Sequence, residues 1–289
     1  MTLLIRLRSQ MISPIPSGLN NGDFVYKDFN KDFEKLIHMV ENGENFAFSR
    51  FSDGELFILQ NKTVVLAEKH YVTGDISGPN IYTKEEQKEF YPDRHAFYRD
   101  RLIECFKHNQ DNYFKGICTS TDGHVGRENF KWMIDFHGGD HPNLTFANLL
   151  INANYSKFVE RMVPLFSQRK ILYVVNGLAK VNNLPFNVEK SFIIGTNCMI
   201  NDYDKVEVVK DYIAKNSIKD AIILCSAASL SNYIIHDCFK DNCNNTFLDI
   251  GSCLNPLLNL EGWKYTRGYL TSYWMNSGSQ FGKQVDIWN

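Results

Sequence analysis

Two carboxylates separated by one glycine are the feature of this sequence with the clearest chemistry. Asp53, Gly54 and Glu55 follow a short apolar segment at residues 46–51. Two carboxylate groups about 5 Å apart repel each other by roughly 3 kcal/mol at an effective dielectric constant of about 20. A divalent cation removes this repulsion, and Mg²⁺ or Mn²⁺ commonly combines a few protein carboxylates with phosphate oxygens. The pair therefore predicts a site for Mn²⁺ or Mg²⁺ beside a diphosphate, and Arg50 adds a guanidinium that can contact phosphate.

The same residues also suit a turn that starts a helix. Serine and aspartate are preferred helix N-caps, because their side-chain oxygens accept hydrogen bonds from the first free backbone N–H groups. Ser52 or Asp53 would then cap a helix that begins at Glu55. The spacing alone leaves the metal site and the structural turn both open.

Helical and strand patterns alternate along the chain. Helices are predicted over residues 29–40, 93–109, 155–166, 203–213 and 228–240. Short apolar strands are predicted at residues 46–51, 116–119, 171–175, 192–194, 221–225 and 246–250. Apolar strands between amphipathic helices indicate an α/β fold, in which a mostly parallel sheet is covered by helices on both faces. We expect residues 1–289 to form one domain, with peripheral segments at 1–25 and, rich in aromatic residues, at 260–289.

Small and polar residues follow most of the predicted strands. In a parallel sheet, ligands collect at the carboxyl ends of the strands, where loops meet helix N-termini. Small residues there let the backbone approach a ligand and offer N–H donors to phosphate oxygens. The residues predicted to contact substrate at this edge are Arg50, Asn176, Gly177, Asn197, Asn201, Ser226, Ala227, Ser229, Asp249 and Ser252.

Two further polar loops contain side chains that can exchange a proton. Asp122 and His124 follow a predicted strand, and Asp140 lies in a second loop. Each of them has the chemistry of a general base for an acceptor hydroxyl, although surface turns contain the same residue types. His137 and His141 would share a metal ion if a helix ran through both, but the two glycines between them disfavour a helix.

The composition argues against several classes of protein. The 31 basic and 33 acidic residues give a net charge of −2, without the basic excess of a nucleic-acid-binding protein. No apolar run is long enough to predict a transmembrane segment. The seven cysteines form no Cys-x-x-Cys pair, which indicates reduced thiols and a cytoplasmic protein. No Gly-x-Gly-x-x-Gly turn follows a strand, which disfavours dinucleotide oxidoreductases and methyltransferases.

Residues 48–56 read Phe-Ser-Arg-Phe-Ser-Asp-Gly-Glu-Leu. This segment resembles the Arg-(Phe/Tyr)-Gly-Asp-Gly-Glu signature of the GT-D-type glycosyltransferases, formerly a domain of unknown function. Later segments resemble other stretches of that family in the same order, at residues 171–177, 195–204, 224–229 and 248–252. The chain departs from the family where Ser52 replaces a glycine, Ser226 and Ala227 replace Gly-Pro, and Ser252 replaces a histidine. If that histidine helps to hold metal in the family, this chain uses another ligand, water or a weaker site.

The resemblance implies a Rossmann-like GT-D fold and an Asp-x-Glu motif that acts with a divalent cation and a nucleotide-sugar donor. We therefore expect a metal-dependent glycosyltransferase. It would move a sugar from a nucleoside diphosphate sugar, foremost a UDP-sugar, to a hydroxyl of a glycan or glycoconjugate. Asp53 and Glu55 would hold Mn²⁺ or Mg²⁺, which neutralises the departing diphosphate. Asp122 or His124 would activate the acceptor hydroxyl.

Other functions stay open at this point. A metal-dependent phosphoester hydrolase would use the same carboxylate pair with the histidines at 124, 137 and 141. A non-catalytic nucleotide-binding or glycan-binding protein would keep the scaffold without chemistry. Tyr273 or Trp274 would stack on a sugar in one interpretation, although aromatic residues in a closing segment more often pack on the core. The sequence is also compatible with an oligomer.

Overall fold

Seven parallel strands form the central sheet. The computed structural model describes residues 28–79, 83–119, 125–151 and 154–276. The strand order is β7-β6-β1-β11-β10-β8-β9, and each neighbouring pair is parallel. In this order the strands are β7 (Leu144–Phe146), β6 (Tyr113–Ile117), β1 (Ala47–Phe51), β11 (Thr246–Asp249), β10 (Ile222–Cys225), β8 (Ile171–Asn176) and β9 (Lys190–Ile194). The predicted mostly parallel sheet is confirmed.

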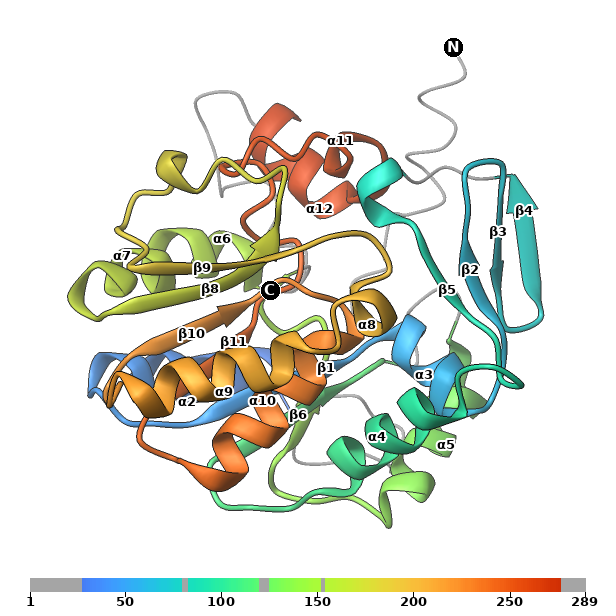
Figure 1. Cartoon of the computed structure of the whole chain (residues 1–289), viewed down its shortest axis with the longest axis horizontal. Helices are drawn as coiled ribbons and strands as arrows, with labels where there is room; N and C mark the ends of the chain where they lie inside the picture. Colours follow the sequence, from blue (N-terminus) through green and yellow to red (C-terminus); the bar gives the residue numbers. More distant parts are fainter. Residues whose placement is uncertain (1–27, 80–82, 120–124, 152–153, 277–289) are drawn as a thin grey trace.

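Helices cover both faces of this sheet, as predicted (Figure 1). One face packs against α3 (Asp53–Leu59), α4 (Ala96–Lys107), α5 (Gly126–His137), α8 (Cys198–Asn201), α9 (Lys205–Lys215) and α10 (Ser229–Asp241). The other face packs against α2 (Phe29–Glu41), α6 (Tyr155–Lys157), α7 (Val163–Leu165), α11 (Trp263–Thr266) and α12 (Gly268–Thr271). Single 3-10 turns lie at Lys84–Glu86, Phe166–Gln168 and Val181–Asn183.

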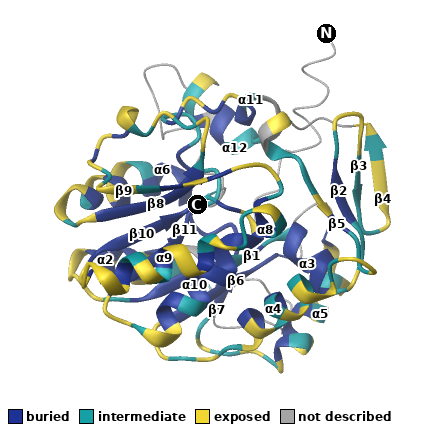
Figure 2. Cartoon of the chain, viewed as in Figure 1, coloured by how far each residue is buried: buried dark blue, intermediate teal, exposed yellow. Residues whose placement is uncertain are grey.

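The strands are apolar throughout because both of their faces are buried. Along β8, Leu172 and Val174 belong to the first core, whereas Ile171, Tyr173 and Val175 belong to the second. Successive side chains of a strand point to opposite faces, so this alternation places one core on each side of the sheet. Figure 2 shows the central strands as a continuous buried layer.

A second sheet, which the sequence analysis did not predict, lies beside α3 (Figure 1). It contains β2 (Val64–Leu66), β3 (His70–Thr73), β4 (Ile76–Pro79) and β5 (Lys88–Phe90). The strands pair antiparallel in the order β4-β3-β2-β5. Each strand has only three or four residues, and β3 and β4 are partly exposed. Segments of three or four residues are too short to give a clear period-two pattern.

The predicted helix over 155–166 is interrupted. A short α6 is followed by a π-helical turn at Phe158–Met162 and then by α7. Pro164 lies in α7, and a proline has no N–H for the helical ladder and clashes with the carbonyl four residues earlier. The wider π turn accommodates this conflict while the apolar face stays on the core. A second π turn lies at Ser272–Asn276.

Among the described helices, none combines the length and the hydrophobicity that crossing a bilayer requires. The N-terminal segment 1–25 lies outside the described residues. Of the C-terminal segment, α11 and α12 pack on the second core. The division of the chain into one domain with two peripheral segments stays a prediction.

A fully buried lysine lies in the middle of β6. Lys115 Nζ donates to the carbonyl oxygen of Phe106 at 2.9 Å and to Asn109 Oδ1 at 2.9 Å. It also donates to Nε2 of His137 at 2.6 Å, and the opposite ring nitrogen of His137 donates to the carbonyl of Gly139. The imidazole is therefore neutral, and burial together with Lys115 lowers the pKa of His137 to about 4.

This pair predicts a loss of stability in acid. The pKa of His137 rises from about 4 to its ordinary value of 6.5 on unfolding, so the unfolded chain binds more protons between these pH values. We expect the stability that His137 contributes to fall by about 2.5 kcal/mol as the pH drops from 6.5 to 4. Urea unfolding of wild type and His137→Gln across this range measures the difference. A constant difference between the two proteins would contradict the prediction.

Candidate functional site

Glu55 is fixed at the carboxyl edge of the sheet by two hydrogen bonds. The backbone N–H of Ser52 donates to Glu55 Oε2 at 3.0 Å, and the hydroxyl of Ser229 donates to Oε1 at 2.6 Å. Ser52 is the N-cap of α3, so the turn that the sequence allowed is present. The helix begins at Asp53, two residues earlier than predicted. Glu55 is 6% exposed, and its carboxylate joins the turn after β1 to the start of α10.

Asp53 is more accessible than Glu55. Its side chain is half-buried, and Oδ1 accepts a hydrogen bond from the N–H of Gly54 at 2.9 Å. Oδ2 accepts none among the described residues. The ammonium of Lys88, from β5 of the small sheet, lies over Gly54: a Cβ atom added to that glycine would be 2.8 Å from Nζ. The carboxylate pair therefore has a cationic side chain beside it.

Arg50 in β1 and Asp249 at the end of β11 lie beneath the carboxylate pair and form the floor of the candidate site. Arg50 Nε donates to the carbonyl oxygen of Ala147 at 2.5 Å, and Nη1 lies 3.8 Å from Asp249 Oδ1. The carboxylate of Asp249 also accepts from the N–H of Gly251 at 3.0 Å. Burial raises the pKa of Asp249 to about 6, Arg50 opposes this shift, and the negative charge of Glu55 adds to it. The two acidic side chains thus lie close enough to influence each other.

The loops predicted to contact nucleotide line the same edge of the sheet, but several of their polar groups are already bonded. Gly177 N–H donates to the carbonyl of Ile194, and Ala227 N–H donates to Ser231 Oγ. Asn176 Oδ1 accepts from the N–H of Leu178.

The other predicted contact residues have their own partners. Asn197 Oδ1 accepts from the N–H of Glu89 at 3.0 Å, and Asn201 Nδ2 donates to the carbonyl of Thr196. The hydroxyl of Ser226 bonds that of Tyr173 at 2.9 Å. Ser252, which stands where the family has histidine, bonds the hydroxyl of Tyr269 at 2.6 Å. Hydrogen bonds within and between these loops thus hold their polar groups in place. Among the predicted contact residues, Ser229 is the one that donates a hydrogen bond to the carboxylate pair, at Glu55.

The described part of the chain brings no proposed general base to this site. Asp122 and His124 lie outside the described residues. Asp140 is exposed and accepts a hydrogen bond from the N–H of His141. Because α5 runs back from the carboxyl end of β6 to the start of β7, its last residue, His137, lies at the opposite edge of the sheet.

A shared metal at His137 and His141 does not fit the structure. Gly138 ends α5 with φ of 108°, as the two glycines predict, so no helix aligns the rings. The ring centroids are 6.0 Å apart, and His137 Nε2 is engaged by Lys115.

The two aromatic residues considered for sugar stacking pack on the core instead. Tyr273 is 3% exposed and meets the ring of Tyr155 edge-on, with centroids 5.2 Å apart. Trp274 Nε1 donates to the hydroxyl of Tyr155 at 2.8 Å. These two aromatic residues near the C-terminus therefore pack on the core, as aromatic residues in such segments usually do.

Two residues at this edge were missed by the sequence analysis. Asn148 follows β7 and is 5% exposed, yet neither Nδ2 nor Oδ1 has a hydrogen-bond partner in the described part of the chain. A buried amide without a partner costs stability, so it is a candidate ligand contact. The sequence feature that could have indicated Asn148 is a polar residue directly after a short apolar run. Lys88 had no signal, since its strand was not predicted.

Asp53 and Glu55 offer a partial set of metal ligands. Within the described residues, no group of three His, Cys, Asp or Glu side chains is arranged to hold a metal ion. Each oxygen of Glu55 accepts one hydrogen bond and keeps a second lone pair, and Asp53 Oδ2 is unengaged there. Mg²⁺ usually takes one or two protein carboxylates and completes its coordination with water and phosphate. The pair fits a cation that binds together with a phosphate group.

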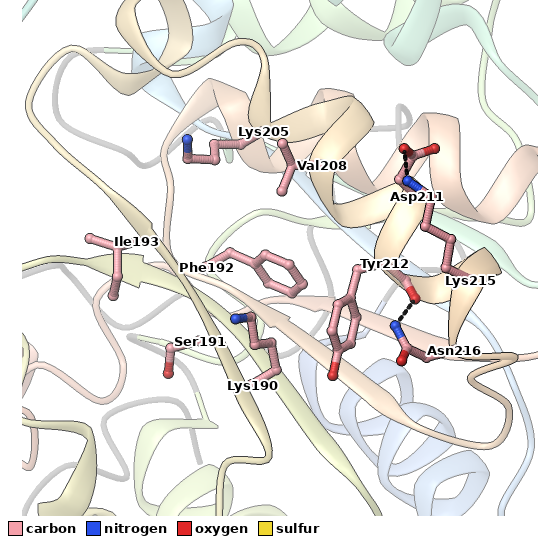
Figure 3. A pocket seen from close by; sticks show the side chains of 10 residues that line it. All are labelled: Lys190, Ser191, Phe192, Ile193, Lys205, Val208, Asp211, Tyr212, Lys215 and Asn216. Carbon is pink, nitrogen blue, oxygen red and sulfur yellow. Dashed lines mark hydrogen bonds and ion pairs between the residues drawn. The ribbon is translucent and has the colours of Figure 1, made fainter.

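A groove of about 610 Å³ lies elsewhere, between β9 and α9 (Figure 3). Its lining residues are Lys190, Ser191, Phe192, Ile193, Lys205, Val208, Asp211, Tyr212, Lys215 and Asn216. Asp211 and Lys215 form an ion pair at 2.8 Å along its wall. Because β9 is the edge strand and β1 is central, this groove is remote from the carboxylate pair.

Gly251 gives a prediction for the floor of the site. Its φ is +49°, and an added Cβ would overlap Arg50 Nη1. We expect Gly251→Ala to lower the free energy of unfolding by about 2–3 kcal/mol, because backbone strain and displacement of Arg50 add together. Gly43→Ala is the matched control, since Gly43 has φ of +70° and nothing within 4 Å. It should cost about 1 kcal/mol in urea unfolding, and equal losses would contradict the role given to Arg50.

No protein-family model and no curated protein matches the sequence. Among solved structures, "A New Glycosyltransferase (DUF1792) from Streptococcus sanguinis" is similar at TM-score 0.50 and 13% identity, over 78% of this chain and 80% of that one. Two further structures of the domain of unknown function 1792 give TM-scores of 0.49 and 0.48 at 11% identity, each over 76% of this chain. The first likeness shows that this chain has the fold of the Streptococcus sanguinis glycosyltransferase, which confirms the fold expected from the GT-D resemblance.

Proposed function

We propose that this protein is a glycosyltransferase that uses a nucleoside diphosphate sugar, with a UDP-sugar as the first candidate. The observation that carries the proposal is the position of Asp53 and Glu55. Both follow β1 at the carboxyl edge of a parallel sheet, where Rossmann-like folds bind nucleotides. Fold alone does not define chemistry, so the proposal depends on this site. The acceptor is proposed to be a hydroxyl of a glycan or glycoconjugate.

In the proposed reaction, Asp53 and Glu55 hold Mg²⁺ or Mn²⁺, which supplies positive charge to the leaving diphosphate. Ser52 and Ser229 orient Glu55 through both of its oxygens. Arg50 lies at the same edge, with Nη1 3.8 Å from Asp249 Oδ1. The bond from the anomeric carbon to the diphosphate breaks, and the acceptor oxygen forms the new bond. Asp122 or His124 is proposed to take the hydroxyl proton.

The cellular site is proposed to be the cytoplasm. All seven cysteines are free thiols, and six of them are buried. Disulfides are uncommon where glutathione and thioredoxin keep thiols reduced. The free thiols support this proposal.

A ligand screen tests the choice of donor. UDP-, GDP- and dTDP-sugars are each added with and without Mn²⁺, and the thermal midpoint is recorded. A ligand at 100 times its dissociation constant stabilises the folded state by about 2.7 kcal/mol, so the correct donor raises the midpoint measurably. The rise should be larger with Mn²⁺. Release of sugar that needs no acceptor would favour the phosphoester hydrolase, and binding without turnover would favour a nucleotide-binding protein.

Loss of Asp53 and loss of Glu55 should both lower the rate of sugar transfer, but only loss of Glu55 should also lower stability. Asp53→Asn removes the accessible carboxylate and should lower the rate of sugar transfer about 100- to 1,000-fold with unchanged stability. Glu55→Gln should lower transfer as well, and it should also cost about 1 kcal/mol of stability, because it weakens the helix cap and the bond to Ser229. Transfer assays and urea unfolding measure the two effects.

Asp211→Asn is the control for this pair. Its carboxylate lies on the surface of α9 in an ion pair with Lys215, four residues along the helix. Such a pair contributes about 0.5 kcal/mol at most, so this variant should transfer sugar at the wild-type rate. Undiminished transfer in both Asp53→Asn and Glu55→Gln would overturn the proposed mechanism.

A further inference from the structure

Lys88 extends its ammonium from the small sheet to Gly54, the residue between the two carboxylates of α3. Nζ is the atom that a Cβ on Gly54 would meet first, at 2.8 Å, and Cε would be 3.9 Å away. Gly54 is itself buried between Asp53 and Glu55. The absence of a side chain at residue 54 is therefore what leaves room for the ammonium.

The strand that carries Lys88 is held in place on both sides of this residue. The N–H of Asn197 donates to the carbonyl oxygen of Gln87 at 3.0 Å, and the N–H of Glu89 donates to Asn197 Oδ1 at 3.0 Å. Asn197 is the N-cap of α8, with φ of 51°. Lys88 is thus positioned by one of the loops that the sequence analysis assigned to nucleotide binding.

The described part of the chain provides no partner for the charge of Lys88. Its side chain is half-buried, and its ammonium makes no ion pair or hydrogen bond with the residues that the structure describes. By contrast, Lys62, near the same small sheet, pairs with Asp75 at 2.5 Å. Burial raises the pKa of the Cys198 thiol to about 12, and the positive charge of Lys88 opposes that shift, so the ammonium also lies near α8.

We propose that Lys88 binds the diphosphate of the donor, as a direct cationic contact beside the Asp-x-Glu pair. This inference rests on the proposed function. A lysine ammonium is a compact point charge with three donors, and such groups bind phosphate oxygens. A half-buried ammonium without an internal partner gains most from an anionic ligand, because its hydration is already incomplete. The small sheet thereby contributes a residue to the site.

A purely structural role for Lys88 predicts different measurements. In that case the ammonium would only balance Asp53 and Glu55 and hold the small sheet against α3. Its removal would then weaken every ligand together with the fold. A phosphate contact instead acts on ligands that contain phosphate and leaves others unchanged.

Calorimetry with UDP, inorganic pyrophosphate and uridine separates these roles. In metal-free buffer, Lys88→Met should weaken UDP and pyrophosphate about 10- to 100-fold, the range for a hydrogen bond to a charged group. Uridine affinity and the thermal midpoint should stay at wild-type values. Lys88→Arg keeps the charge and should restore part of the UDP affinity. Lys62→Met is the matched control, and it should bind all three ligands as wild type does.

Gly54→Ala provides a second variant that keeps every charge. The added methyl group displaces the end of a flexible side chain, so the fold can adjust, and alanine favours the helix more than glycine does. We expect weaker UDP binding than in wild type, with stability unchanged or higher. This variant moves the ammonium without altering either carboxylate.

The outcomes separate the two proposals. Wild-type affinity for UDP in both Lys88→Met and Gly54→Ala would overturn the role of Lys88 and leave the proposed function intact. A joint loss of uridine binding and thermal stability in Lys88→Met would also overturn it, in favour of the structural role. If the wild-type protein binds neither UDP nor pyrophosphate, with or without Mn²⁺, the proposed function itself fails and the inference fails with it.

Discussion

The hydrogen bonds of Glu55 hold the candidate site together. Its carboxylate accepts hydrogen bonds from the backbone N–H of Ser52, the N-cap of α3, and from the hydroxyl of Ser229, the first residue of α10. Ser229 lies 174 residues after Glu55 in the sequence. Burying a charge is unfavourable unless it is hydrogen-bonded, and these two bonds give each oxygen of Glu55 a partner at 6% exposure. Because α3 follows β1 and α10 follows β10, this carboxylate fixes two loops of the sheet relative to each other.

The structural and functional interpretations of the Asp-Gly-Glu turn are compatible. The capping interaction uses one lone pair on one oxygen of Glu55 and leaves Asp53 at the accessible end of the turn. The glycine between them accommodates Lys88, which belongs to a separate sheet. A single turn thus starts a helix, presents a carboxylate and receives a cationic side chain.

The parts of the fold that could be predicted are those in which local pattern and burial agree. The strands at 171–175 and 246–250 were predicted within one residue, because each is a continuous apolar run buried on both faces. The small sheet was missed because its strands have only three or four residues, and some of them, such as His70–Thr73, are of mixed polarity. Lys88 was missed with it. The contact between Glu55 and Ser229 depends on tertiary packing, which no local spacing encodes.

The balance of charge at the site bears on how it would bind its ligands. Asp53, Glu55 and Asp249 provide three carboxylates, and Arg50 and Lys88 provide two cationic groups, which leaves one excess negative charge near neutral pH. A diphosphate that binds alone is repelled by this excess negative charge. A bound divalent cation changes the excess to one positive charge, which attracts the diphosphate. Under the proposed function, cation and diphosphate therefore favour each other's binding, which is the reciprocity that thermodynamic linkage requires. A partial ligand set suits this arrangement better than a closed metal site, because the substrate then completes the coordination of the cation.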